Sequence, residues 1–128
     1  MLSELNKEAY DIQSFLEIEC SDQPQEVKER LSTLGVYIAR TGKMLSEAKR
    51  LLREKKSSQI ADTVIKIARE NFLSAKAQNA LIDSLAVEEN MLVDWLDRLN
   101  SACVHQADIC RSLLSYTKQE IAASLYNN

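Results

Sequence analysis

His105 and Asp108 come closest, by residue type and spacing, to a catalytic pair. An imidazole and a carboxylate three positions apart lie on one face of a helix, where the carboxylate could support acid–base chemistry. No serine or cysteine nucleophile joins that face, because Cys103, two residues before His105, falls on nearly the opposite side of the helix. That separation, in a chain with one histidine, does not favour a zinc site. We therefore expect no enzyme activity, no metal and no cofactor.

A second interpretation of the same segment is structural. Asn100, His105 and Gln106 belong to the stretch from Asp94 to Tyr116, which concentrates the distinctive polar side chains of the chain. Buried polar groups of this kind can fix the register of packed helices or subunits. We expect these three residues to make such contacts.

Scarce turn residues restrict the fold class. The chain of 128 residues has two glycines and one proline, whereas a β-rich fold needs turn residues about every 8–12 positions. Glycine-rich nucleotide-binding loops cannot be built from these two glycines either. The apolar fraction of 45% and the charged fraction of 27% are typical of a globular protein. The sequence predicts an all-α fold with a single domain over residues 1–128.

Cysteine usage and the N-terminus indicate a cytoplasmic protein. Cys20, Cys103 and Cys110 are interpreted as reduced thiols that act as small apolar core residues, because an odd number of three makes no disulfide framework. The N-terminus has no basic-then-apolar signal pattern, and no uncharged run approaches the ~20 residues of a membrane span. We expect no membrane contact.

Hydrophobic periodicity predicts about four helices. Their expected ranges are 3–20, 23–56, 58–84 and 86–125. A serine or aspartate cap followed by Pro24 in the first turn marks the start of the second helix, and Lys55 and Lys56 suit its end. No glycine or proline separates the last two helices, so these two could be partly continuous.

Apolar residues recur along the second predicted helix at alternating intervals of four and three, which is a heptad pattern, and the third predicted helix repeats it with small residues. The residues expected in this core or oligomer seam are Leu31, Leu34, Ile38, Leu45, Leu52, Phe72, Trp95 and Leu99. Helices of about 30 residues span ~45 Å, and long helices with such a pattern usually pack against a neighbour. We expect a long-helix bundle that forms a homo-oligomer.

Charge is distributed unevenly along the chain. Residues 1–27 carry a net charge of −6, residues 28–78 carry +7 and residues 79–128 carry −4, within an overall −3. Such asymmetry is typical of a nucleic-acid surface, and equally of charge pairing within or between subunits. The candidate DNA-binding residues, all on the second predicted helix, are Arg40, Lys43, Lys49, Arg50, Arg53, Lys55 and Lys56.

A stripe of small residues runs into these basic residues on the same helix. The stripe consists of Gly35, Ala39, Gly42 and Ser46 and continues as Lys49, Arg53 and Lys56. A glycine costs about 1 kcal/mol inside a helix, so both glycines need a packing or contact reason. Either a phosphate backbone or a partner helix approaches closely there, or the glycines permit a tight crossing within the bundle while the basic residues are solvated.

The order of these elements resembles that of the UvsY-type recombination mediators, which are small helical accessory proteins of tailed phages. The resemblance lies in an acidic helix at residues 4–20, a long basic helix with RTGKMLSEAKRLLREKK at 40–56, and a C-terminal helix with WLDRLNSACVHQ at 95–106. It implies a ring-forming oligomer in the host-cell cytoplasm that binds single-stranded DNA. Such an oligomer helps to load a strand-exchange recombinase onto strands coated with single-strand-binding protein. The alternative is a structural, adaptor or host-system inhibitor protein whose helices make only protein–protein contacts.

Overall fold

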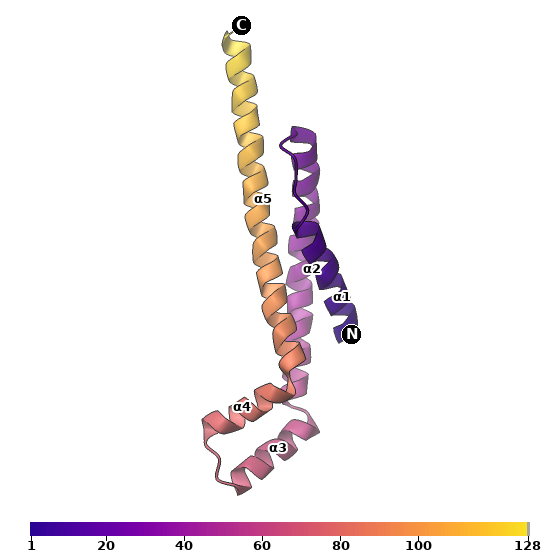
Figure 1. Cartoon of the computed structure of the whole chain (residues 1–128), viewed down its shortest axis with the longest axis vertical. Coiled ribbons are helices and arrows are strands. Elements are labelled where there is room, and N and C mark those ends of the chain that lie inside the picture. Colours follow the sequence, from indigo (N-terminus) through magenta and orange to yellow (C-terminus); the bar gives the residue numbers. More distant parts are fainter. Residues whose placement is uncertain (128) are drawn as a thin grey trace.

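The computed structural model describes the backbone of residues 1–127 and is helical over most of it. The helices, in chain order, are α1 (Leu2–Leu16), α2 (Pro24–Lys56), α3 (Gln59–Glu70), α4 (Ala75–Leu85) and α5 (Val87–Asn127). α2 and α5 form a long antiparallel pair, α1 lies along this pair, and α3 and α4 form a hairpin at one end of it (Figure 1). The prediction of an all-α fold is confirmed.

The turn between α1 and α2 differs from the predicted one. Pro24 occupies the first turn of α2, as expected, but the cap residue is Gln23, whose side chain makes no capping hydrogen bond. The predicted serine or aspartate cap is therefore wrong. Ser21 instead hydrogen-bonds Glu26 through its hydroxyl and accepts the N–H of Gln23 at 3.2 Å. α1 ends at Leu16, with Glu17 as its C-cap, and not at the predicted residue 20.

Residues 71–74 divide the third predicted helix into α3 and α4, so the prediction of one helix over residues 58–84 is wrong. Each half has its own N-cap. The hydroxyls of Ser58 and Ser74 accept backbone N–H groups of the first turns of α3 and α4 at 3.3 and 3.1 Å. Ala86 then separates α4 from α5, so these helices are not continuous.

α3 ends in a Schellman-type turn. The N–H of Leu73 donates to the Ala68 carbonyl at 3.0 Å, and the N–H of Phe72 donates to the Arg69 carbonyl at 3.1 Å. This turn places Phe72 at a φ of 57°, the left-handed conformation that normally favours glycine. Its side chain is 96% exposed, so the prediction that Phe72 belongs to a buried seam is wrong.

The main core runs along the contact between α2 and α5. Leu34 and Leu99 are fully buried there, as predicted. The other predicted seam residues on these two helices are partly buried: Leu31, Ile38, Leu45, Leu52 and Trp95. α5 therefore supplies, within one chain, the neighbour that the heptad pattern of α2 requires. That pattern by itself no longer calls for a second copy.

α1 closes the remaining side of this core. Leu5, Ala9 and Ile12, one helical turn apart, are at most 3% exposed. Phe15 meets Tyr37 of α2 edge to face, with ring centroids 5.1 Å apart. One face of α2 is thus covered by α1 and α5, which leaves the opposite face to solvent.

Candidate nucleic-acid interface

Three of the seven candidate DNA-binding residues have acidic partners in the folded chain. Arg50 pairs with Glu54 on the next turn of α2 at 2.7 Å, and Lys56 reaches Asp83 of α4 at 3.1 Å. The third, Arg40, pairs with Glu8 of α1. The interpretation of the charge asymmetry as internal pairing is therefore correct for part of the basic segment.

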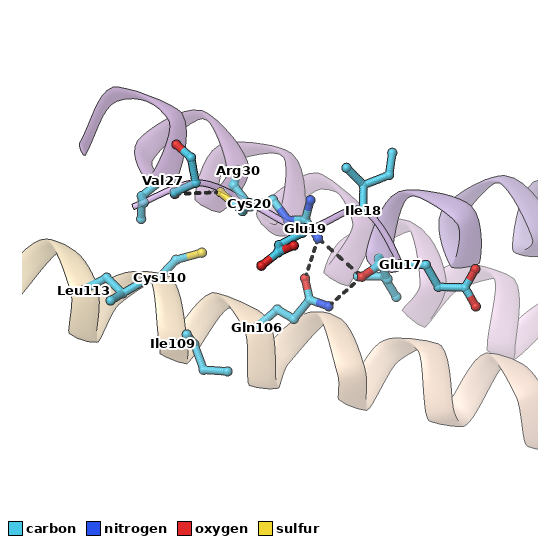
Figure 2. A pocket seen from close by; sticks show the side chains of 12 residues that line it. Glu17, Ile18, Glu19, Cys20, Val27, Arg30, Gln106, Ile109, Cys110 and Leu113 are labelled. Carbon is cyan, nitrogen blue, oxygen red and sulfur yellow. Dashed lines mark hydrogen bonds between the residues drawn. The ribbon is translucent and has the colours of Figure 1, made fainter. Parts of the chain in front are cut away.

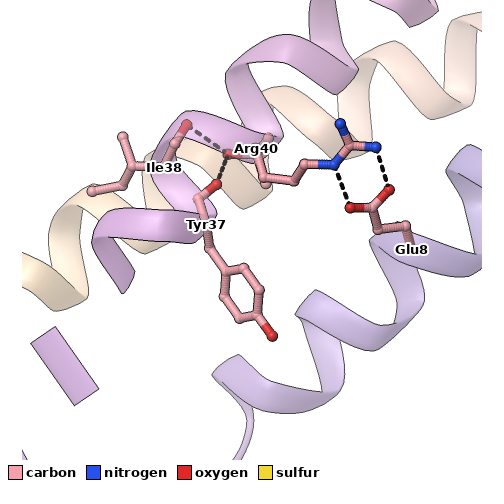
Figure 3. A network of polar contacts seen from close by, with 5 residues as sticks. Glu8, Tyr37, Ile38 and Arg40 are labelled. Atoms are coloured by element: carbon pink, nitrogen blue, oxygen red, sulfur yellow. Dashed lines mark hydrogen bonds and ion pairs between the residues drawn. The ribbon is translucent and has the colours of Figure 1, made fainter. Parts of the chain in front are cut away.

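The Arg40–Glu8 pair joins α1 to α2 in a bidentate geometry (Figure 3). The Arg40 Nη2 group donates to Glu8 Oε2 at 2.7 Å, and its Nε group donates to the other carboxylate oxygen. The hydrogen bonds from Arg40 lower the pKa of Glu8 below its ordinary value. Because Glu8 occupies the Nε–Nη2 edge of its guanidinium and holds it against α1, Arg40 is a clamp between helices and is not part of the open side of α2.

The remaining candidates divide between two sides of α2. Lys43, Lys49 and Arg53 are exposed, and within the described chain no carboxylate lies within ion-pair distance of them. Lys55 is also exposed, but it lies about 200° around the helix from Arg53 and lines a cavity with Leu2 of α1. Lys55 therefore does not share a surface with the other three.

Small residues occupy the same side of α2 as Lys43, Lys49 and Arg53. We call this surface the open face of α2, and it consists of Gly35, Ala39, Gly42, Lys43, Ser46, Lys49, Arg50 and Arg53, all exposed. A Cβ added at Gly35 would meet nothing within 4 Å, and one added at Gly42 would meet only the Asn100 side-chain amide at 3.9 Å. A tight helix crossing within the chain therefore does not explain either glycine.

Two of the three predicted register-fixing residues make the expected contacts. The Asn100 amide donates to the Ile38 carbonyl at 3.0 Å and to the Thr41 hydroxyl at 2.9 Å. The Gln106 amide bridges the turn after α1 to α2: it donates to the Leu16 carbonyl at 3.1 Å and accepts from Arg30 at 2.9 Å (Figure 2). Both contacts tie α5 to α2 or α1 at one register.

His105 does not follow the prediction, because its side chain is exposed. Asp108 accepts a hydrogen bond from Arg111 at 2.7 Å, and among the described residues no hydrogen bond or ion pair joins it to His105. Across the described residues, histidine, cysteine, aspartate and glutamate form no group of three that could hold a metal ion. Within this segment, Asn100 and Gln106 make contacts between helices.

A partly apolar cavity of about 310 Å³ lies where the turn after α1 meets α5 (Figure 2). Its walls include Ile18, Cys20, Val27, Ile109, Cys110 and Leu113. Burial raises the pKa of the Cys110 thiol, and also that of Cys103 deeper in the core, so both behave as the predicted apolar residues. Sequence periodicity gave no indication of this cavity.

Arg30 was missed as a structural residue. Its guanidinium stacks over the Phe15 ring at 4.3 Å from the ring centroid and hydrogen-bonds Gln106. The signal was present, since Arg30 lies on the core side of α2 between Val27 and Leu34.

Comparison with known proteins provides no relative: no family model, curated protein or solved structure matches the chain. None of the described helices combines the length and the hydropathy required to cross a bilayer.

Proposed function

We propose that the protein is a non-enzymatic, self-associating accessory protein of DNA recombination or replication that binds single-stranded DNA along the open face of α2. The observation that supports this proposal is that exposed cationic side chains and an unobstructed helix backbone occur together on this face. Lys43, Lys49 and Arg53 have no acidic partner among the described residues, and the glycines beside them permit close approach of a phosphate backbone.

The expected mode of binding is electrostatic and independent of base sequence. Lysine and arginine contacts to phosphates release counterions, so affinity falls steeply as salt rises. Tyr37, the one aromatic residue near the basic segment, packs on Phe15 in the core, which leaves base stacking little part in binding. As the resemblance to UvsY-type mediators implies, the bound strand would then receive a strand-exchange recombinase in the cytoplasm of the host cell.

Fluorescence anisotropy with a labelled single-stranded oligonucleotide tests this proposal. The wild-type protein should bind at about 50 mM salt and lose affinity as salt rises. Replacing Lys43, Lys49 and Arg53 together by glutamine should weaken binding about tenfold or more. The slope of log affinity against log salt should fall by about 2, because each lost phosphate contact on a single strand is worth ~0.7.

A matched control removes the same charge elsewhere. Lys7, Lys66 and Lys76 are exposed on α1, α3 and α4, and their joint replacement by glutamine should leave the salt slope unchanged. Equal losses in both triple variants would mean that binding follows net charge and not the open face. Absence of wild-type binding at low salt would reject the DNA proposal.

The second candidate function is that of an adaptor or inhibitor protein. It is favoured by the apolar surface of the α3–α4 hairpin, where Ile60, Ile67 and Phe72 are 64%, 53% and 96% exposed. Two results together would support this candidate instead: the protein binds no single-stranded DNA, and the Phe72→Ala substitution abolishes binding of its cellular partner.

A further inference from the structure

The last three turns of α5 extend beyond the rest of the molecule. α5 continues past the start of α2, as its C-terminal end in Figure 1 shows. From Lys118 to Tyr126 every side chain is exposed, including Ile121 at 57% and Leu125 at 73%. An isolated helix of this length is marginally stable in water, so a packing partner would stabilise it.

The exposed segment carries the same seam that packs on α2. Within the bundle, α5 buries Leu96, Leu99, Cys103, Ala107 and Cys110 at spacings of three and four. The same spacing continues through Leu114, Thr117, Ile121 and Leu125. None of these four is charged. Leu114 still packs against the core and Thr117 is half-buried, whereas Ile121 and Leu125 lie exposed beyond the start of α2 at Pro24. An established helix–helix interface therefore continues, unpartnered, into solvent.

We propose that this continuation of the seam, residues 114–125 of α5, pairs with the same segment of a second copy in a two-fold antiparallel arrangement. The inference rests on the self-association included in the proposed function and names its surface. It does not involve the open face of α2, so DNA binding and pairing can fail independently.

The register follows from the positions of the seam residues. An antiparallel pairing that places Thr117 opposite the second copy's Ile121 also places Leu125 of that copy opposite Leu113, which lies beside the seam next to Leu114. Leu113 lines the 310 Å³ cavity at the end of the bundle, so Leu125 of each copy would lie at the cavity of the other. The C-terminal end of the second copy's helix would thereby lie next to the start of α2 at Pro24. This pairing is self-complementary and closed, as two-fold symmetry requires.

Mass measured by light scattering after size exclusion, without DNA, tests the pairing. Short helical interfaces are weak, so the protein concentration is raised to about 200 µM. At that concentration the measured mass of the wild type should approach twice the 14.5 kDa of one chain. Ile121→Arg should return the mass to that of one chain. Ala123→Arg, which adds the same charge on the opposite side of the helix, should not. Circular dichroism should show that the bundle of both variants unfolds at the wild-type temperature.

A spin label distinguishes the antiparallel arrangement from a parallel one. The label is placed at Tyr126→Cys, in a chain whose Cys20 and Cys110 are replaced by alanine and whose buried Cys103 is retained. The proposed register separates the two labels by roughly 20 Å along the axis, whereas parallel helices would bring them to about 10 Å. A wild-type mass of one chain, an association that Ile121→Arg leaves intact, or the shorter distance would overturn the proposal.

Discussion

Arg40 illustrates, at the scale of the residue, why position in a basic segment does not establish a role. It is one of seven bases between residues 40 and 56, and only its partner 32 residues away distinguishes it from Lys43. Local spacing predicts pairs within one helix, such as Arg50 with Glu54. It does not predict Glu8, because that contact depends on how α1 packs against α2.

The Arg40–Glu8 pair predicts a pH-dependent contribution to stability. The pKa of Glu8 is lowered in the folded chain, so the contribution is present above its ordinary value of 4.5 and disappears as pH falls through the folded value. Both side chains are more than a third exposed, so we expect only about 0.5 kcal/mol. Glu8→Gln should lower the free energy of unfolding by that amount at pH 7 and by less at pH 2.5. Urea unfolding measures the free energy of unfolding at each pH, and Glu4→Gln is the control. Equal losses of stability at pH 7 and pH 2.5 in Glu8→Gln would contradict this interpretation.

The elements divide clearly into those that the sequence predicted and those that it did not. α2 lies close to its predicted range because its heptad pattern is long and Pro24 marks its start, and α5 lies close to the predicted range 86–125. The break between α3 and α4 was missed because the chain uses Phe72, and not glycine, in the left-handed position of the turn. The candidate site stays a prediction. The sequence placed its residues on α2, and the structure adds the tertiary ion pairs of Arg40 with Glu8 and of Lys56 with Asp83, which spacing along one helix does not reveal.

The turn at Phe72 makes a prediction about the α3–α4 hairpin. A residue other than glycine in the left-handed region costs roughly 1–2 kcal/mol of conformational free energy. Phe72 is 96% exposed, so packing of its ring does not offset this cost. Phe72→Gly should therefore stabilise the hairpin by about 1 kcal/mol, seen as slower amide exchange in α3 and α4. Asn71→Gly, one residue earlier, should destabilise it, because it loses the side-chain hydrogen bond to the Ile67 carbonyl. Faster exchange in Phe72→Gly would show that the exposed ring has a packing role.

The whole molecule presents three different surfaces, two on the long α2–α5 pair and one on the hairpin at its end. The open face of α2 carries cations, the α3–α4 hairpin carries exposed apolar side chains, and the end of α5 carries an unpartnered seam. The core between α2 and α5, fixed in register by Asn100 and Gln106, holds these surfaces apart. This division predicts that DNA binding and self-association can be removed separately.

The central claim, that single-stranded DNA lies along the open face of α2, is tested most directly at its two glycines. Gly35 and Gly42 are the only glycines in the chain, so selective ¹⁵N-glycine labelling gives one backbone amide signal from each. Adding a single-stranded oligonucleotide at about 50 mM salt should shift both signals, and raising the salt should reverse the shift. Two signals that stay in place while anisotropy reports saturated binding would contradict the claim, because the DNA would then lie elsewhere on the molecule.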